Sequence, residues 1–314
     1  MLDFRQCDII DHETGLSFDR PLPRTLVHKS AVSEVFLTDV AQLGSGRFAV
    51  AAQWPRDHVM FRPSAPGTLD PLLLVETVRQ SAIGVSHLYY DVPANHAFVL
   101  TELDFDIDGA ATRPAGDEPP AVFIDLTCTH NSPRPGRLDM TMEAVVSVDH
   151  RRRARVGLRW RAVDREQYAR MRWRGASPSA AAPLPPTDAA MVYESEAISP
   201  ETVGRPNARD VVLAPLTDGD WRLRLDPGHP VLFDHSCDHV PGMALLEAFR
   251  QAGSITGGHG ARMPYGAKVR FTAFGEPDAP VTISAGRPDG GIQRVTAVQD
   301  GVTLAEATLR SGTC

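Results

Sequence analysis

The sequence predicts an α+β fold in which an antiparallel sheet wraps around one long apolar helix, twice along the chain. Three observations lead to this prediction. Two apolar stretches of helical length occupy 71–87 and 242–256, and a short predicted strand precedes each. Four strand-like segments, separated by proline and glycine, follow each helix. Landmark residues of the first half also recur in the second half in the same order.

Composition narrows the possible classes of protein. The chain has 314 residues, of which 42% are apolar and 23% charged, as in ordinary globular proteins of about two domains. No apolar run approaches the ~18 residues of a membrane-spanning helix, and the acidic start is unlike a signal peptide. We therefore expect a cytoplasmic protein that does not bind membranes. The net charge of -7, without a recognisable basic helix, argues against nucleic acid as a partner.

The elements follow from local signals. In the first half, Asp70 is a good N-cap and Pro71 suits the first helical position, because its missing N–H would be unpaired there anyway. The predicted strands of this half are 48–54, 96–108, 121–130, 138–149 and 152–164. Those of the second half are 221–226, 267–274, 280–285, 292–299 and 303–309. Tight turns between consecutive strands predict an antiparallel meander, against which each apolar helix must be buried.

The domain boundaries come from one biased stretch. Residues 176–188 are rich in proline and alanine and read as a linker between repeats at 1–175 and 189–314. A sheet wrapped around one central helix, twice over, is a double hotdog fold. Its halves pair like the subunits of a homodimer, with two clefts at their interface. We expect a pseudo-dimeric monomer, and association of two such chains into a homodimer stays open.

The internal repeat is the most informative pattern. The spacing from the first acid to an Asp-His pair is 23 residues in one half and 24 in the other, and from that histidine to the helix glutamate it is 18 and 12. An insertion of six residues within 61–69 explains most of the difference. In order, the matched residues are Glu34 and Asp210, Asp57-His58 and Asp234-His235, Glu76 and Glu247, Arg79 and Arg250, and Gln80 and Gln251.

Each long helix carries a glutamate inside an apolar stretch, with arginine three residues later on the same face. One interpretation is a structural ion pair at the wet edge of the helix. The other is catalytic, because burial raises the pKa of a carboxylate and a nearby arginine lowers it again. A glutamate balanced in this way could exchange a proton with a hydroxyl. Both interpretations apply to Glu76 with Arg79 and to Glu247 with Arg250.

Further candidates lie before the second helix. Gly242 lets the backbone approach closely at a helix N-terminus, where free N–H groups could form an oxyanion hole for a thioester. His58 and His235 could each act as an acid or base, or could simply bridge the loop to the helix. Asp238 and His239 are weaker candidates, and Cys237 is more consistent with an incidental thiol than with a nucleophile. The cysteines have neither CxxC nor zinc spacing, so no metal site is expected.

Four segments, 27–35, 52–58, 70–80 and 233–243, together resemble the A-factor synthase (AfsA-type) family, and the resemblance extends over nearly the whole chain. These are γ-butyrolactone biosynthesis proteins of actinobacteria built from two hotdog repeats. The resemblance implies an acyltransferase that moves a β-ketoacyl group from an acyl carrier protein to the hydroxyl of dihydroxyacetone phosphate. The product then closes to a butenolide, the precursor of a diffusible signal that controls antibiotic production. The acyl group would be carried on phosphopantetheine, without a metal or redox cofactor.

The resemblance also implies site residues. Glu76, Glu247 and Arg250 match the family's motifs. We expect Glu247 as the base, Arg250 as a phosphate clamp or orienter of the glutamate, and Glu76 as the counterpart of Glu247 in the other cleft. His235 completes the catalytic candidates. The substrate-binding candidates are Arg79, Gln251, Gly242, His58, Lys29 and Arg56.

One departure separates the two halves, and two other functions compete. The first helix begins with Asp70-Pro71 where the second begins with Pro241-Gly242, which predicts unequal clefts and a principal site at the second helix. The start of the second helix is also similar to that of β-hydroxyacyl-ACP dehydratases. The alternatives are therefore a hotdog dehydratase or thioesterase acting on acyl-ACP or acyl-CoA, and a non-catalytic acyl- or lactone-binding protein.

Overall fold

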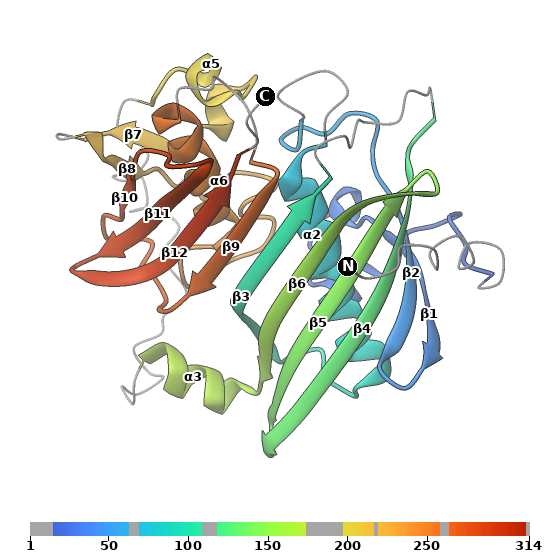
Figure 1. The fold of residues 1–314 in the computed structure, drawn as a ribbon. Coiled ribbons are helices and arrows are strands. Elements are labelled where there is room, and N and C mark those ends of the chain that lie inside the picture. Colours follow the sequence, from blue (N-terminus) through green and yellow to red (C-terminus); the bar gives the residue numbers. More distant parts are fainter. Residues whose placement is uncertain are drawn as a thin grey trace.

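A computed structural model describes residues 15–62, 69–108, 118–173, 197–216, 219–257 and 264–311. Its described strands form one twelve-stranded sheet in which all neighbouring strands are antiparallel. The two long helices, α2 (Pro71–Tyr89) and α6 (Gly242–Thr256), lie on the same side of this sheet (Figure 1). The structure therefore confirms the predicted sheet and its two central helices, and the linker at 176–188 lies outside the described residues.

The strand order shows the two repeats directly. It runs β1-β2-β4-β5-β6-β3 and then, in mirrored order, β9-β12-β11-β10-β8-β7. The first half contributes β1 (Leu37–Gly44), β2 (Arg47–Gln53), β3 (Ala97–Ile107), β4 (Ala121–Arg134), β5 (Arg137–Val148) and β6 (Arg151–Val163). The second contributes β7 (Leu213–Pro215), β8 (Trp221–Leu223), β9 (Gly266–Phe271), β10 (Thr282–Ala285), β11 (Ile292–Gln299) and β12 (Val302–Arg310).

The repeats join through β3 and β9, which pair from Glu102 opposite Arg270 to Asp106 opposite Gly266. This seam makes one continuous sheet, as a shared edge does in a dimer. The meander prediction holds for the hairpins of β4, β5 and β6. It is wrong for β3 and β9, which lie beside the last strand of their own repeat, β6 and β12, and so become the seam strands.

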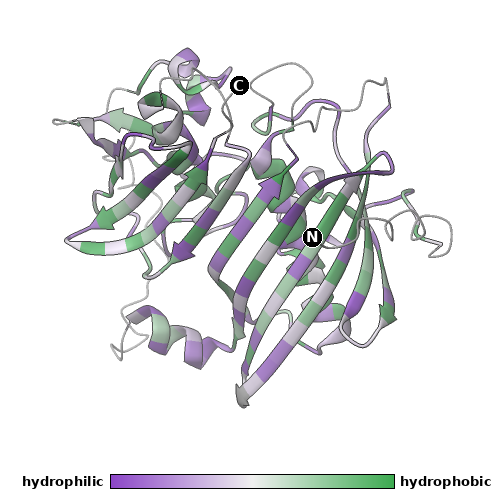
Figure 2. Cartoon of the chain, in the orientation of Figure 1, coloured by the Kyte–Doolittle hydropathy of each residue, from purple (hydrophilic) through white to green (hydrophobic). Residues whose placement is uncertain are grey.

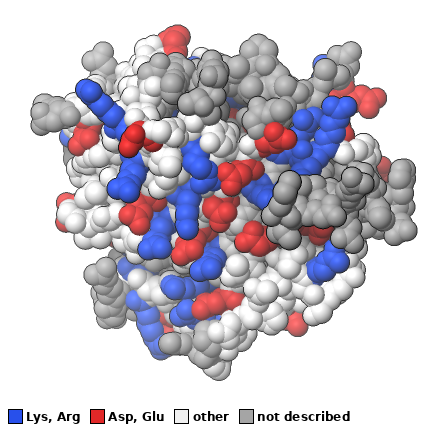
Figure 3. Space-filling view, in the orientation of Figure 1, with Lys and Arg blue, Asp and Glu red and all other residues white. Residues whose placement is uncertain are grey.

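Alternating side chains explain why the sheet has one dry face. Colours alternate along β4, β5 and β6 in Figure 2, and the inward residues of these strands are buried. The outer face in Figure 3 mixes basic and acidic side chains without a patch of one sign. Glu102, for example, lies 3.6 Å from Arg159 and 4.0 Å from Arg270. Among the helices that the structure describes, none has the length and apolar character to cross a membrane.

The helices start as their sequences predict. The Asp70 side chain accepts a hydrogen bond from the Leu72 N–H at 2.8 Å, which caps α2. Nearly all of α2 and most of α6 are buried in the core. A third helix, α3 (Arg165–Trp173), was not predicted. Its signal is Asp164, whose Oδ1 accepts from the Gln167 N–H at 2.7 Å, the helix-start pattern of an acid followed by glutamine three residues later.

Candidate active site

Two buried clusters of charged side chains lie at equivalent places in the two repeats. In the first, the Glu76 carboxylate accepts from Arg79 Nε and Nη2 at 2.8 and 2.9 Å and lies 2.9 Å from Lys29 Nζ. In the second, the Glu247 carboxylate accepts two hydrogen bonds from Arg250 and two from Arg205, at 2.6–2.9 Å. Lys29 and Arg205 are 176 positions apart, and each glutamate is 171 positions from its counterpart.

The glutamine after each arginine fixes its glutamate to the fold. Gln80 donates to Glu76 at 2.9 Å, and its other bonds join the backbone just before β1. Gln251 donates to Glu247 at 2.5 Å and bonds the equivalent backbone before β7. Gln251 is fully buried among protein groups, so the structure supports a positioning role for it rather than the expected contact with substrate.

The predicted match between the two Asp-His pairs is wrong. His58 Nδ1 accepts from the backbone N–H groups two and three residues further along, and its Nε2 lies 3.4 Å from Glu34. His229, not His235, makes the same two backbone contacts, and its Nε2 lies 3.1 Å from Asp210. Both histidines then precede their helix glutamate by 18 residues, so no six-residue insertion is needed. His58 is thus a buried bridge within its loop, the structural alternative that the sequence left open.

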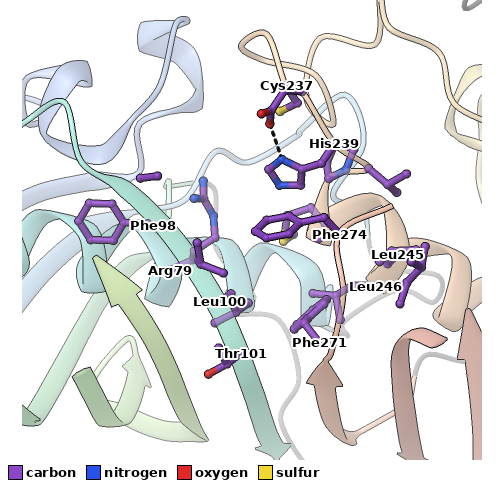
Figure 4. A pocket seen from close by; sticks show the side chains of 18 of the residues that line it. Arg79, Phe98, Leu100, Thr101, Cys237, His239, Leu245, Leu246, Phe271 and Phe274 are labelled. Atoms are coloured by element: carbon purple, nitrogen blue, oxygen red, sulfur yellow. Dashed lines mark hydrogen bonds and ion pairs between the residues drawn. The ribbon is translucent and has the colours of Figure 1, made fainter. Parts of the chain in front are cut away.

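A cavity of about 920 Å³ opens beside the first cluster and is lined by both repeats. Lys29, Glu76 and Arg79 reach it from the first repeat. The loop 234–239 and the start of α6 reach it from the second. In Figure 4, Arg79 projects into the space between Phe98 and Phe274. Its side chain is 24% exposed, against 4% for Lys29 and 2% for Glu76, so Arg79 is the charged group of this cluster that a ligand could best reach.

Apolar side chains form much of the remaining wall. They come from α2, β3 and β6 of the first repeat and from α6, β9 and β12 of the second, so a ligand would lie between the repeats. These residues are Val75, Ile83, Leu100, Leu158, Leu245, Leu246, Phe271 and Leu304. A cavity of this size that combines apolar walls with converging polar side chains is typical of sites for small organic ligands.

The loop 234–239 is fixed against the first repeat. Both Asp234 oxygens accept backbone N–H bonds, from Ser30 at 2.7 Å and from Ala31 at 3.0 Å, directly after Lys29. His235 follows, with Nδ1 3.5 Å from Asp234 Oδ2. Burial, and then the positive charge of Arg79, lower the pKa of His235. Both effects favour the neutral imidazole, which lines the cavity.

This loop has no chemical equivalent in the first repeat. At an offset of 171 positions, 234–239 corresponds to 63–68, which reads Pro-Ser-Ala-Pro-Gly-Thr and lies outside the described residues. The acids, histidines and thiol at this place thus belong to one repeat only.

The N-termini of the two helices also differ, because a side chain caps α2 but not α6. Asp70 occupies the N-terminus of α2 with its own carboxylate, which bonds the Leu72 N–H. The equivalent N-cap of α6 is Pro241, and no side chain caps that helix. A Cβ on Gly242 would meet only ordinary contact, 3.6 Å from Phe271, so packing alone does not require glycine there. The first N–H groups of α6 therefore lie at the cavity without a side-chain acceptor.

The equivalent cleft of the other cluster is closed by Arg205. Besides its two bonds to Glu247, Arg205 donates from Nη1 to Asp70 Oδ2 at 3.0 Å and to the Met60 carbonyl at 2.7 Å. It thereby joins the second repeat's cluster to the start of the first repeat's helix. The side chains of Arg205, Glu247 and Asp70 are completely buried.

The expected base role of Glu247 does not fit this arrangement. Glu247 and Arg250 do not line the large cavity. Burial raises the pKa of Glu247, but Arg205 and Arg250 outweigh it and lower the pKa to about 2. With both oxygens hydrogen-bonded to two arginines, this carboxylate is held ionised inside the protein. The two clefts are thus unequal because the Arg205 side chain extends to Asp70 of the other repeat and fills one of them. The sequence alone did not indicate this contact.

Glu76 is held ionised as well. Burial raises its pKa, and the charges of Arg79 and Lys29 more than compensate, so its pKa lies well below the ordinary value. The predicted balance near neutrality is therefore wrong for both helix glutamates. Glu76 is suited to hold its two cations at the cavity, and a base must be sought among the neighbouring histidines.

Arg56, the remaining candidate, does not line the large cavity. It is exposed and borders a separate recess of about 40 Å³ near the start of α2. Sequence reasoning missed Arg205 and His229. The constant offsets of 176 and 171 positions could have found both. Within the described ranges, no group of three or more His, Cys, Asp or Glu side chains could hold a metal ion.

Comparison with known proteins adds the family context. A model of the A-factor biosynthesis hotdog domain (AfsA) matches residues 10–164 and 190–314. A 2-oxo-3-(phosphooxy)propyl 3-oxoalkanoate synthase of Streptomyces virginiae is 35% identical over 297 residues, which cover 90% of this chain and 95% of the relative. The synthase of that name from Streptomyces coelicolor is 35% identical over 304 residues, covering 92% and 91%.

Among solved structures, an acyl-ACP thioesterase from Bacteroides thetaiotaomicron is 11% identical, with a TM-score of 0.47, covering 85% of this chain and 98% of that one. A MaoC-like dehydratase is 14% identical, also with a TM-score of 0.47, covering 78% and 85%. Such distant similarity does not bear on the choice between activities.

Proposed function

The chain belongs to the A-factor biosynthesis hotdog domain family, and we propose that, like its Streptomyces relatives, it is a 2-oxo-3-(phosphooxy)propyl 3-oxoalkanoate synthase. The product in that name is the ester of a 3-oxoalkanoic acid with dihydroxyacetone phosphate. The donor is a 3-oxoacyl thioester on the phosphopantetheine of an acyl carrier protein. The acceptor hydroxyl attacks the thioester carbonyl, the carbon–sulfur bond breaks, and the hydroxyl proton ends on the released thiol.

The observation that carries this proposal is the Lys29–Glu76–Arg79 cluster at the wall of a largely apolar cavity. One edge of the Arg79 guanidinium, formed by Nε and Nη2, donates two hydrogen bonds to Glu76. Its Nη1 and the nearby ammonium of Lys29 are suited to the phosphate of the acceptor, because arginine binds phosphate through several N–H groups. The glutamate keeps both cations in place without itself reacting.

The rest of the cavity suits the donor. The uncapped N–H groups at the start of α6, where Gly242 allows a close approach, can bind the oxyanion that forms on the thioester carbonyl. The apolar walls can hold the acyl chain away from water. Loop 234–239 supplies the acid–base groups. Binding, orientation and proton transfer by these residues are sufficient for ester exchange, so the proposal includes no metal or redox cofactor.

One chain holds a complete site in this proposal. Its cations come from the first repeat, and its helix N-terminus and loop from the second. A pseudo-dimeric monomer is therefore the minimal active unit, whether or not two chains associate.

Mass spectrometry of intact proteins tests the proposal. Purified protein is mixed with a 3-oxoacyl carrier protein, with and without dihydroxyacetone phosphate. We expect free holo-carrier protein and the triose ester, or its butenolide, only when both substrates are present. Release of the free acid without acceptor would instead identify a thioesterase. Loss of water from a 3-hydroxyacyl control would identify a dehydratase.

A further inference from the structure

Helix α3, at the end of the first repeat, forms hydrogen bonds with the cavity loop 234–239 of the second repeat. It follows β6 and lies beneath the junction of the two halves in Figure 1. Tyr168 donates its O–H to Asp238 Oδ1 at 2.6 Å. Arg172 donates to the Asp238 carbonyl at 2.6 Å and also binds both oxygens of Glu276. The helix thus holds Asp238 by its side chain and by its backbone.

Asp238 in turn fixes the imidazole of His239. Their Oδ1 and Nδ1 atoms lie 2.7 Å apart, the contact drawn as a dashed line in Figure 4. The Tyr168 and His239 hydrogen bonds lower the pKa of Asp238 although its burial acts to raise it, so this carboxylate stays ionised and can only accept. His239 Nδ1 must therefore donate to it, and in the neutral imidazole this leaves the lone pair on Nε2.

The position of this ring is also fixed. The His239 and Phe274 rings meet edge to face at 5.1 Å, and Tyr168 meets the same phenylalanine at 5.8 Å. His239 lines the cavity. In the part of the chain that the structure describes, no hydrogen bond engages its Nε2. A neutral imidazole with its Nδ1–H held by a carboxylate is the arrangement of a general base.

His235 lacks such a partner. Asp234, the acid nearest to it, already accepts two backbone N–H bonds, and the separation of 3.5 Å to His235 Nδ1 is long. Burial, and then the positive charges of Arg79 and Lys29, lower the pKa of His235 and so disfavour its protonated form. Of the two histidines in loop 234–239, His239 is therefore the better oriented. A third cavity histidine, His28, has its Nε2 within 2.9 Å of His87 Nε2.

We propose that His239 is the catalytic base of acyl transfer and that Asp238 and Tyr168 are its positioning residues. This inference rests on the proposed function. Nε2 takes the proton of the acceptor hydroxyl while the hydroxyl oxygen bonds to the thioester carbon. When the carbon–sulfur bond breaks, Nε2 returns the same proton to the departing sulfur. The base is regenerated, and no further reactant is required.

The sequence of the first repeat agrees with a single such base. Positions 67 and 68, which correspond to Asp238 and His239 at the offset of 171, are glycine and threonine. The repeat that supplies the cations thus lacks the dyad, and the repeat that supplies the dyad has its own cluster closed by Arg205. One functional cleft is assembled from complementary halves.

Kinetics of the variants test the assignment. His239→Ala should lower kcat about 100-fold or more and leave KM for dihydroxyacetone phosphate within about threefold, the loss expected of a missing base. Added imidazole should restore part of that rate. Asp238→Asn and Tyr168→Phe should lower kcat by roughly tenfold and shift the acid limb of the pH–rate profile, which a purely structural role would not do. The matched control is His96→Ala, a half-buried histidine near Asn95 that does not line the cavity.

The opposite pattern would overturn the proposal: near-normal kcat in His239→Ala, or a large loss with imidazole rescue in His235→Ala. If the wild type hydrolyses the thioester instead of transferring it, the synthase proposal fails, and the same variants test the base with water as acceptor. A wild type that leaves the thioester intact would refute both. Nitrogen-15 spectra of histidine-labelled protein need no turnover. They should show His239 protonated at Nδ1 alone, and a proton on Nε2 at neutral pH would also refute the inference.

Discussion

Lys29 and Arg205 occupy equivalent positions in the two repeats, yet one leaves a cleft open and the other closes it. Each precedes the acidic residue before the first strand of its repeat by five positions. Lys29 Nζ contacts Glu76 at 2.9 Å, whereas Arg205 binds Glu247 and also Asp70. The longer, forked side chain of arginine bridges to the other repeat. One cluster consequently lies at the cavity surface, and the other is a buried lock between the repeats.

Removing the charge of Glu247 should mainly destabilise the protein. Glu247→Gln leaves Arg205 and Arg250 buried beside a neutral amide, and breaking such a network costs about 3–5 kcal/mol of unfolding free energy. Glu76→Gln is the matched variant. Its loss should be smaller by ~1 kcal/mol or more, because Arg79 reaches the cavity and can be hydrated. Urea unfolding measures both, and equal losses would contradict the distinction between lock and surface.

Arg79 should contribute to acceptor binding. Arg79→Ala removes a charge-assisted hydrogen bond to phosphate, and we expect KM for dihydroxyacetone phosphate to rise about tenfold or more. The control is Arg47→Ala, which removes an exposed arginine 3.9 Å from Asp125 on the outer part of the sheet. Steady-state kinetics with the acceptor varied would show the effect. An unchanged KM in Arg79→Ala would remove the phosphate role.

The start of α6 offers a change that should separate stability from activity. Pro241→Asp copies the cap that Asp70 gives α2, so the melting temperature should stay the same or rise, by an amount corresponding to ~1 kcal/mol. The new carboxylate would occupy the N–H groups assigned to the oxyanion, and the transfer rate should fall about 100-fold or more. Thermal unfolding and the transfer assay measure the two effects. A stable variant that keeps its activity would exclude this oxyanion hole.

Stability should decrease in acid because of the helix glutamates. The pKa of Glu247 falls from 4.5 to about 2 on folding, so between these values the unfolded chain binds a proton that the folded chain does not. The stabilisation is complete above about pH 5 and is lost as the pH falls toward 2. Urea midpoints between pH 7 and pH 3 would show this decrease. It should be weaker in Glu247→Gln, and an identical decrease in that variant would contradict the assignment.

Much of the fold could be predicted because the apolar spacing within an element and the glycine or proline residues that flank it indicate the same boundaries. The range of α6 and that of β11 match the expected 242–256 and 292–299, since apolar spacing and flanking glycines define both. Helix α3 was missed because its polar composition gives no apolar stripe, although Asp164 and Gln167 carry a capping signal. The position of β3 at the seam depends on pairing between the repeats, which local patterns do not encode.

Local patterns also indicated several residues of the candidate site, whereas contacts between the repeats could not be predicted from them. The helix glutamates and Arg79 were identified because they interrupt apolar patterns and recur in order. Gly242 was identified from its place at the helix start, and Lys29 followed the family resemblance. The two Asp-His pairs were matched because they have the same dipeptide sequence. In the structure it is His58 and His229 that make the same hydrogen bonds to the backbone. Which cleft stays open depends on the reach of Arg205 across the interface between the repeats. That property emerges only when the two repeats are packed together.

A crystal structure of the protein with dihydroxyacetone phosphate, without acyl donor, would locate the acceptor site. We expect the phosphate at Arg79 and Lys29 inside the large cavity, with the reacting hydroxyl facing His239 Nε2. A phosphate bound outside this cavity, or at the Arg205 and Glu247 cluster, would contradict it.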